Sequence, residues 1–344
     1  MRDAALFVCS GILSTLLQQA LLSAGAADAW TALLPFVNYA GMSLLTVGQS
    51  GAARAAAAPS PPPPPSPPDG ARLSAVVWAC VLLDISGFLL AAGAISAAGS
   101  GLYQVLYSSV VIFAALASWA VRRRSLSPRQ VAGVALVIVG TALTARGGGA
   151  GALGAPPTPR VLGGMALSVA AAAVYGCVYG LAELSSSLPG YPGPHALAAR
   201  IGRGVVALLA GYIALAVLPR AHLIAARIAQ AGLMRPRGVL AAYCALAASS
   251  AVHSLAYFHL VAARGATATG VMASLRAVGV FALSAPLFCA TQPAACWSWP
   301  RAAASAVVVG GVLVFSSGSP SAEEGKGGGK GGPGGGGKGR EGDV

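Results

Sequence analysis

The sequence predicts an all-α membrane protein in which ten transmembrane helices form two inverted repeats of five. Three observations carry this prediction. Of the 344 residues, 9% are charged and 56% are hydrophobic, whereas about a quarter of the residues of a soluble domain are charged. Apolar stretches of membrane-spanning length recur along the chain. Two of these stretches also resemble each other in sequence.

Ten apolar stretches are long enough to cross a bilayer as helices. A hydrocarbon core about 30 Å thick needs about 20 residues at a rise of about 1.5 Å per residue. We expect spans at residues 4–24, 30–48, 73–94, 101–121, 128–145, 161–182, 198–218, 238–259, 267–289 and 301–317. Helices 1–2 then occupy residues 1–48, helices 3–5 residues 73–146 and helices 6–10 residues 161–317.

Three segments have the composition of connectors. Residues 49–72 form a Pro/Ala-rich linker, and the nearly continuous proline of 59–68 predicts an extended chain. Residues 147–160 form a Gly/Pro loop. Residues 318–344 form a Gly/Lys-rich tail, which we expect to be disordered because its apolar residues are too few to bury a core.

The first apolar stretch has a second interpretation. Arg2, the apolar run behind it and the small residues of 23–27 also resemble a signal peptide. We expect the helix to be retained, because the run is long for a signal peptide and its removal would unbalance the two halves.

Evidence for a repeat comes from residues 94–116 and 263–285, which line up at an offset of 169 positions. The alignment matches identical residues such as Gly101 and Gly270. Because each half has an odd number of spans, the second half would cross the membrane in the opposite sense, as in many secondary transporters. Chance similarity between two Ala-rich segments is the alternative.

The formal charge of +13 has a topological explanation. The 22 Lys and Arg residues lie mostly at helix ends and in the tail rather than on one face, so we expect no nucleic-acid partner. If both termini are cytosolic, the positive bias favours the cytosolic side in the first half and is reversed around residues 220–237.

Six cysteines occur without the two-residue spacing of a zinc or redox motif. We therefore expect most of them to be small apolar core residues and predict no metal site. Cys289 and Cys296 flank one loop and would form a disulfide if that loop faces an oxidising compartment.

Two full charges are expected deep in the membrane, Asp84 in the third span and Arg276 in the ninth. A charge at that depth costs about 2.5 to 3.5 kcal/mol on insertion scales. At the repeat offset Asp84 corresponds to His253, and Tyr107 corresponds to Arg276. This correspondence favours a cavity shared by the two halves. The alternative is a purely structural pair of Asp84 with Arg276 or with His253.

Two helix faces carry further polar side chains. Gln104 and Tyr107 lie one turn apart on the fourth span, and Tyr175, Tyr179 and Glu183 recur at four-residue spacing on the sixth. Both faces could line a pocket. For the second face the alternative is an interfacial aromatic stripe ending in a solvated acid.

Signatures of catalysis are missing from the sequence. It contains no HExxH, GxSxG or GxxxxGK[ST] motif. Asp84 also has no second acid at its depth, as an intramembrane aspartyl enzyme would need. We therefore predict no enzyme activity, no catalytic residues and no cofactor.

Four blocks of sequence resemble a known family. They are residues 35–44 (PFVNYAGMSL), 102–116 (LYQVLYSSVVIFAAL), 122–143 (RRRSLSPRQVAGVALVIVGTAL) and 265–284 (GATATGVMASLRAVGVFALS). Through them residues 4–317 resemble the drug/metabolite transporter superfamily. Within it, the chain is similar to the solute carrier family 35 branch that includes the nucleotide-sugar transporters, and the first block is similar to its F subgroup.

This resemblance implies ten helices in two inverted halves around a central cavity, with exchange or proton-coupled transport in an endomembrane (Golgi, ER, or vacuole or lysosome). In that family the fourth and ninth helices line the cavity. These helices correspond here to Tyr103, Gln104, Tyr107, Ser274 and Arg276. The paired lysines that nucleotide-sugar carriers often place near the nucleotide are not evident, which argues against a nucleotide sugar.

Together these observations predict a secondary active transporter or exchanger of a small polar, anionic organic solute. Arg276 would contact the anion, while Asp84 and His253 would be its polar partners and Tyr179 would line the site. The expected partners are the solute and the lipid bilayer, and a homodimer is left open. The alternatives are a non-transporting membrane scaffold and an intramembrane enzyme.

Overall fold

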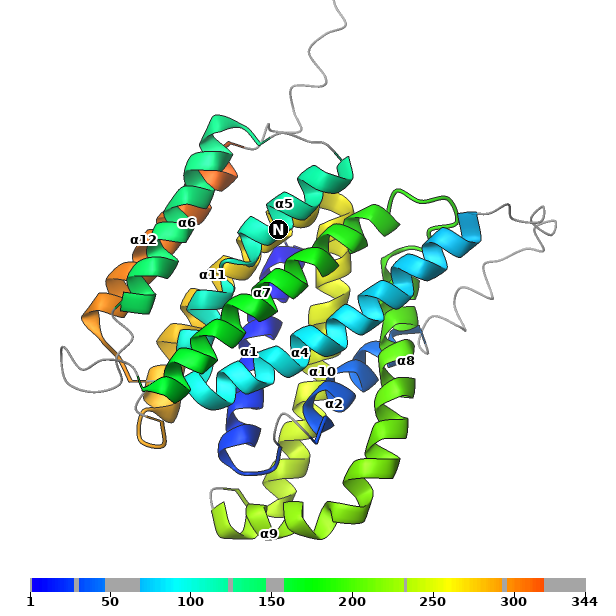
Figure 1. The fold of residues 1–344 in the computed structure, drawn as a ribbon, viewed down its shortest axis with the longest axis vertical. Helices are drawn as coiled ribbons and strands as arrows, with labels where there is room; N and C mark the ends of the chain where they lie inside the picture. Colours follow the sequence, from blue (N-terminus) through cyan, green and yellow to red (C-terminus); the bar gives the residue numbers. More distant parts are fainter. Residues whose placement is uncertain are drawn as a thin grey trace, which may run out of the picture.

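The computed structural model describes residues 2–27, 31–46, 69–122, 126–146, 158–231, 234–292 and 296–318. Within these ranges the chain is helical and contains no strand (Figure 1), which confirms the all-α prediction. Most of the predicted linker, most of the Gly/Pro loop and nearly all of the tail lie outside the described residues.

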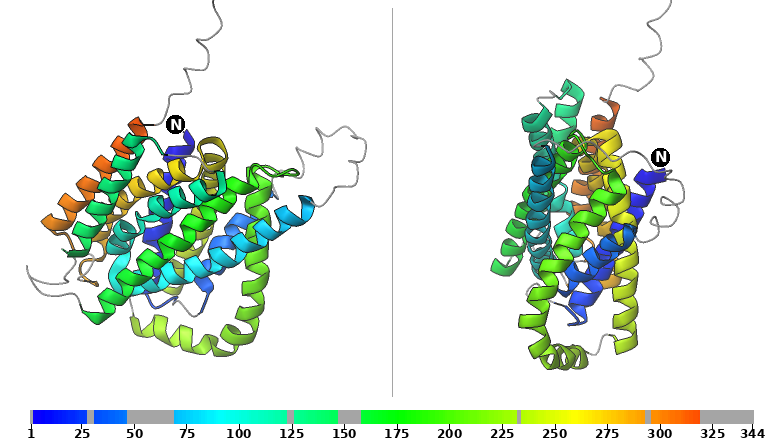
Figure 2. Two further views of the ribbon diagram at one scale, coloured as in Figure 1. Left: turned by 45° about the horizontal axis from the view of Figure 1, so that its top comes forward. Right: turned by 90° about the vertical axis from the view of Figure 1, so that its right-hand side faces the viewer.

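Helices occupy every range predicted to span the membrane. They are α1 (Arg2–Ser23), α2 (Leu33–Ser43), α4 (Asp69–Tyr107), α5 (Val110–Arg122), α6 (Pro128–Arg146), α7 (Pro159–Ser185), α8 (Pro194–Tyr212), α9 (Ala221–Ala231), α10 (Pro236–Arg264), α11 (Ala266–Phe288) and α12 (Trp299–Ser317). The short helix α9 was not predicted. It crosses one end of the bundle between α8 and α10 (Figures 1 and 2).

Six of the described helices are long and apolar enough to cross a membrane: α1, α4, α7, α8 with its continuation, α10 and α11. The helices α5, α6 and α12 contain shorter apolar segments, and α2 has 11 residues. Several long apolar helices in one chain identify an integral, multi-pass membrane protein.

The predicted fourth span, residues 101–121, is not one continuous helix. It is divided between the end of α4 and the whole of α5, with a break at Ser108 and Ser109. The Ser108 hydroxyl donates to the Gln104 carbonyl, and the Ser109 hydroxyl donates to the Leu106 carbonyl. Such bonds are local alternatives to the helical ladder, and they lie at the point where the helix ends within an apolar stretch.

Helix packing places most elements around a common centre. The most extensive neighbours are α4 with α7, α6 with α12, and α1 with α10. The pair α6 and α12 lies side by side at one edge of the molecule (Figures 1 and 2). The helices α1, α2, α4, α7, α10 and α11 line the interior, where one large hydrophobic core surrounds a polar cavity.

Candidate functional site

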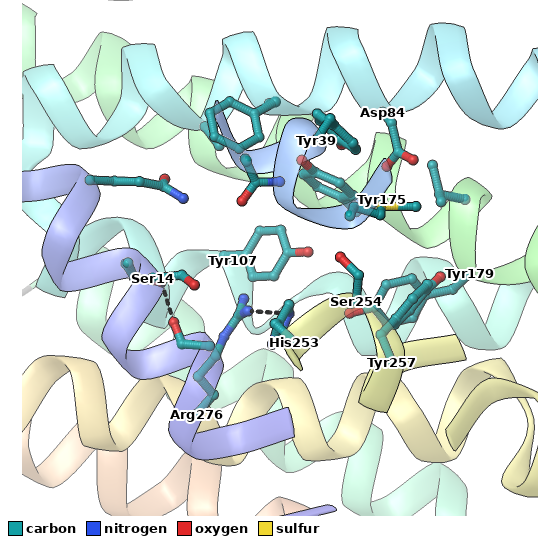
Figure 3. Close-up of a pocket in the computed structure, with 18 of the residues that line it drawn as sticks. Ser14, Tyr39, Asp84, Tyr107, Tyr175, Tyr179, His253, Ser254, Tyr257 and Arg276 are labelled. Atoms are coloured by element: carbon teal, nitrogen blue, oxygen red, sulfur yellow. Dashed lines mark hydrogen bonds between the residues drawn. The ribbon is translucent and has the colours of Figure 1, made fainter. Parts of the chain in front are cut away.

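A cavity of about 130 Å³ lies among α1, α2, α4, α7, α10 and α11. Its wall combines aromatic rings with a small number of charged and polar side chains (Figure 3). Six tyrosines line it: Tyr39, Tyr103, Tyr107, Tyr175, Tyr179 and Tyr257. An aromatic wall with a few convergent polar groups is typical of small-molecule sites.

Arg276 of α11 forms the basic end of the cavity. The residue is 8% exposed, and its guanidinium lies over the Tyr107 ring, 5.4 Å from the centroid. Nη2 and Nε lie 3.1 and 3.2 Å from one terminal atom of the Gln104 amide. Because both arginine atoms are donors, that atom is the amide oxygen. Gln104 therefore fixes one edge of the guanidinium.

His253 of α10 supports the opposite edge of Arg276. Its Nε2 lies 3.3 Å from Nη1 of Arg276 (dashed in Figure 3), and its Nδ1 lies 3.0 Å from the Phe7 carbonyl oxygen. A carbonyl only accepts, so Nδ1 carries the proton and Nε2 accepts from the arginine. This arrangement requires a neutral imidazole. The ring also stacks on Phe7 at a centroid distance of 4.6 Å.

Close approach of α1 makes room for this pair. A Cβ added to Gly11 would lie 2.4 Å from Cδ of Arg276 and 2.8 Å from Cε1 of His253. A side chain at this position would therefore displace both groups. Gly11 thus allows α1 to pack closely against Arg276, which helps to fix the position of the arginine.

Asp84 of α4 forms the acidic end of the cavity, and it is 6% exposed. It hydrogen-bonds to the Tyr39 hydroxyl of α2, which also bonds to Tyr175 of α7. Figure 3 shows Asp84 and Tyr39 on one side of the cavity and Arg276 with His253 on the other. The arrangement therefore separates an acceptor end from a donor end.

The hydrogen bonds of the described side chains do not favour either structural pair considered from the sequence. Arg276 bonds to Gln104 and His253, while Asp84 bonds to Tyr39. Asp84 and Arg276 are both buried, yet each is held by neutral partners.

Six of the eight predicted site residues line the cavity: Asp84, Tyr103, Tyr107, Tyr179, His253 and Arg276. The other two, Gln104 and Ser274, lie behind its wall. Gln104 is fully buried beside Arg276. The Ser274 hydroxyl donates to the Ser108 and Gly270 carbonyls, and it thereby joins α11 to the end of α4.

The stripe on α7 divides between two roles. Tyr175 and Tyr179 line the cavity. Glu183 does not, and the interpretation as a solvated acid is wrong, because Glu183 is 2% exposed. Its Oε2 accepts from the Ala266 amide at the start of α11, at 3.1 Å.

Sequence reasoning missed Tyr39, Tyr257 and Ser14 as cavity residues. Tyr257 lies one turn beyond His253 on α10, a spacing that could have indicated it. For Tyr39 and Ser14 the sequence carries no comparable signal, because a single polar residue in an apolar stretch does not reveal which way it faces.

The disulfide does not line the cavity. The conditional prediction of a disulfide between Cys289 and Cys296 is confirmed, and it closes the connection after α11. Within the described ranges, no three His, Cys, Asp or Glu residues are grouped so that they could hold a metal ion.

Comparison with known proteins gives one family match. Residues 31–146 match the EamA-like transporter family. This segment is similar to an EamA-like transporter domain. It runs from before α2 to the end of α6 and carries Tyr39, Asp84, Tyr103, Gln104 and Tyr107. The match supports the drug/metabolite transporter superfamily, whereas the relation to solute carrier family 35 stays a prediction.

The fold also has relatives among solved structures. A structure described as "Crystal structure of protein" is 19% identical, covers 90% of this chain and 97% of its own, and gives a TM-score of 0.55. At that identity the likeness concerns the fold. The curated proteins include no significant match to the sequence. The segment that matches the EamA-like family thus lies in a chain whose fold resembles a known structure over 90% of its length.

Proposed function

We propose that the protein is a secondary transporter of a small, polar, anionic organic solute, which it moves by alternating access. The observation that carries this proposal is the buried guanidinium of Arg276 at the cavity wall. Its contacts with Gln104 and His253 use Nε and one N–H on each terminal nitrogen. The second N–H on Nη1 and on Nη2 can together form a bidentate pair with a carboxylate or phosphate.

The remaining wall fits the rest of such a solute. The six tyrosines offer rings for an organic body and hydroxyls for its polar groups. Asp84 and Tyr39, on the other side of the cavity, would accept from a hydroxyl or amine of the solute. Asp84 forms the acidic end of the cavity, and its carboxyl group can bind and release a proton. We therefore also assign proton coupling to Asp84.

Helix packing supports two inverted halves of five spans. In this scheme α1 corresponds to α7, α2 to α8, and the part of α4 before Gly99 to α10. The end of α4 together with α5 corresponds to α11, and α6 corresponds to α12. The contacts α4–α7 and α5–α7 then correspond to α10–α1 and α11–α1, and α2–α10 corresponds to α8–α4. Three further contacts join equivalent helices of the two halves, so exchanging the halves leaves each contact unchanged: α2–α8, α5–α11 and α6–α12. A cavity between related halves is the usual site of such carriers.

The disulfide supports an orientation. Disulfides persist in oxidising compartments, so the connection between Cys289 and Cys296 would face a lumen or the cell exterior. With ten spans both termini then lie in the cytosol. We place the protein in an endomembrane such as the ER, the Golgi or a vacuole, with this connection in the lumen.

The test begins with ligand binding. Purified protein would be screened by thermal shift against nucleotides, sugar phosphates, dicarboxylates, amino acids and peptides, with neutral and cationic analogues beside them. A ligand of the folded state raises the melting temperature. We expect anions to shift it and their neutral analogues to have little effect.

Uptake into liposomes then separates transport from binding. The anion with the largest shift should enter saturably, and Arg276→Ala should abolish this flux. Arg203→Ala is the matched control, because Arg203 is exposed on α8 away from the cavity. A folded protein that gives no saturable flux with any solute of the panel would indicate a scaffold and contradict the proposal.

A further inference from the structure

Two glycines break the helices that line the cavity. Gly99 lies within α4 at φ 84° and ψ 157°, and Gly265 separates α10 from α11 at φ 85° and ψ 170°. Side-chain-bearing residues rarely adopt this conformation, whereas glycine does so freely. The helix after Gly99 carries Tyr103 and Tyr107, and the helix after Gly265 carries Arg276.

A side chain from another helix caps each broken helix. The Ser100 amide donates to Oε1 of Gln19 at 2.8 Å, and the Ala266 amide donates to Oε2 of Glu183 at 3.1 Å. First-turn amides have no partner within their own helix, so these contacts satisfy groups that would otherwise be unpaired in an apolar interior. Both capping residues are 2% exposed.

The caps occupy equivalent places in the two proposed halves. Gln19 lies near the end of α1 and Glu183 near the end of α7, the first helix of each half. The capped amides of Ser100 and Ala266 are 166 positions apart, as are the two glycines. The structural register therefore differs by three residues from the offset of 169 in the sequence alignment. At this register Asp84 corresponds to Ser250 and Tyr107 to Ala273, so the predicted correspondence of Asp84 with His253 and of Tyr107 with Arg276 does not hold.

The caps lie at opposite ends of the bundle. In Figure 1, α1 ends beside the end of α11, whereas α7 ends beside the start of α11. At the first end, Nε2 of Gln19 also donates to Oε1 of Gln292 at 2.6 Å. A Cβ on Gly99 would lie 3.3 Å from the Gln292 side chain. A glycine break with a capping side chain thus lies at each of two opposite ends of the helices that line the cavity.

The chemistry of the two caps differs. The carboxylate of Glu183 faces the positive end of the α11 dipole, and a bond from an amide to an ionised acceptor is about twice as strong as a neutral one. Gln19 offers a neutral amide to the equivalent position. The two caps therefore differ in the charge that the capping side chain can carry.

We infer that Gln19 and Glu183 are paired positioning residues that hold the cavity-lining helices closed at opposite mouths, and that the difference in their charge sets which mouth opens more readily. This inference rests on the alternating-access proposal above. Neither residue lines the cavity. They act on the solute through the positions of Tyr107 and Arg276.

Amide hydrogen exchange of the full-length protein, without solute, tests the inference directly. Glu183→Gln keeps an acceptor of the same shape but removes its charge. We expect exchange in residues 265–272 to accelerate about tenfold, equivalent to about 1.4 kcal/mol, and exchange in residues 99–107 to slow. Gln19→Glu should produce the opposite pattern. The matched controls are Asp3→Asn and Gln230→Glu, which make the same changes at exposed positions.

The response at the distant mouth decides between a gate and a simple cap. If each substitution changes exchange only beside itself, or at neither mouth, the inference is wrong. Gln19→Glu provides the test if Glu183→Gln does not fold. Because no solute is used, failure of this experiment leaves the flux result intact, and loss of flux in liposomes leaves the exchange result intact.

Discussion

Gln104→Glu would test the electrostatic role of Arg276 without changing the shape of the site. Gln104 is fully buried, and its amide oxygen accepts from Nη2 and Nε of Arg276 at 3.1 and 3.2 Å. A glutamate in the same position keeps both bonds and adds one negative charge. The guanidinium would then be neutralised from behind, on the side away from the solute.

The magnitude follows from the position of Gln104 behind the guanidinium. An anion on the free edge of Arg276 would lie about 7 Å from the new carboxylate, which at an effective dielectric constant of about 20 gives a repulsion of about 2.4 kcal/mol. This energy corresponds to a roughly 50-fold weaker affinity. The solute-free protein should be at least as stable as the wild type, because the arginine gains a charged partner in place of a neutral one.

Binding of the anion that gives the largest thermal shift would be measured by titration for Gln104→Glu and for Gln230→Glu. The second variant has the same change of net charge on the exposed face of α9, so it should bind as the wild type does. If Gln104→Glu is folded and binds the anion with unchanged or higher affinity, Arg276 does not attract the solute by its charge.

Three further predictions concern other parts of the molecule. Asp84→Asn should reduce flux at least tenfold while the protein remains folded, and unchanged flux in liposomes would remove Asp84 from the mechanism. A Cβ at Gly176 would lie 2.3 Å from the nearest side-chain atom, so Gly176→Ala should cost about 1 to 3 kcal/mol and lower the melting temperature. Gly163→Ala, with nothing within 4 Å of its Cβ, is the control, and equal melting of both variants would refute the packing argument. Maleimide should label Cys296 in Cys289→Ser, whereas labelling of Cys296 in the unreduced wild type would contradict the disulfide.

Much of the architecture could be predicted from the sequence because of the cost of polar groups in lipid. Long apolar stretches between charged segments become helices, and helices lie in all ten predicted ranges. The same cost explains why Asp84, His253 and Arg276 could be expected to meet at a cavity. A charge in an apolar helix is tolerated where it borders a polar interior.

What the sequence could not predict depends on helix rotation and on single backbone conformations. Gln104 and Tyr107 share a helix face, yet one holds Arg276 from behind and the other lines the cavity. Gly99 is one of many glycines, and its break is visible only in its dihedral angles. Glu183 lies near a helix end, which suggested solvation, because a capping contact with a sequence-distant helix leaves no local signature.

Counterflow in liposomes tests the central claim most directly. Vesicles that contain the wild-type protein would be preloaded with the unlabelled anion identified by thermal shift, and entry of the labelled anion would then be followed. A carrier that alternates between two mouths should accumulate label transiently above its equilibrium level, and Arg276→Ala should abolish this overshoot while Arg203→Ala retains it. Entry at the rate of protein-free vesicles, or an overshoot that survives Arg276→Ala, would contradict the account.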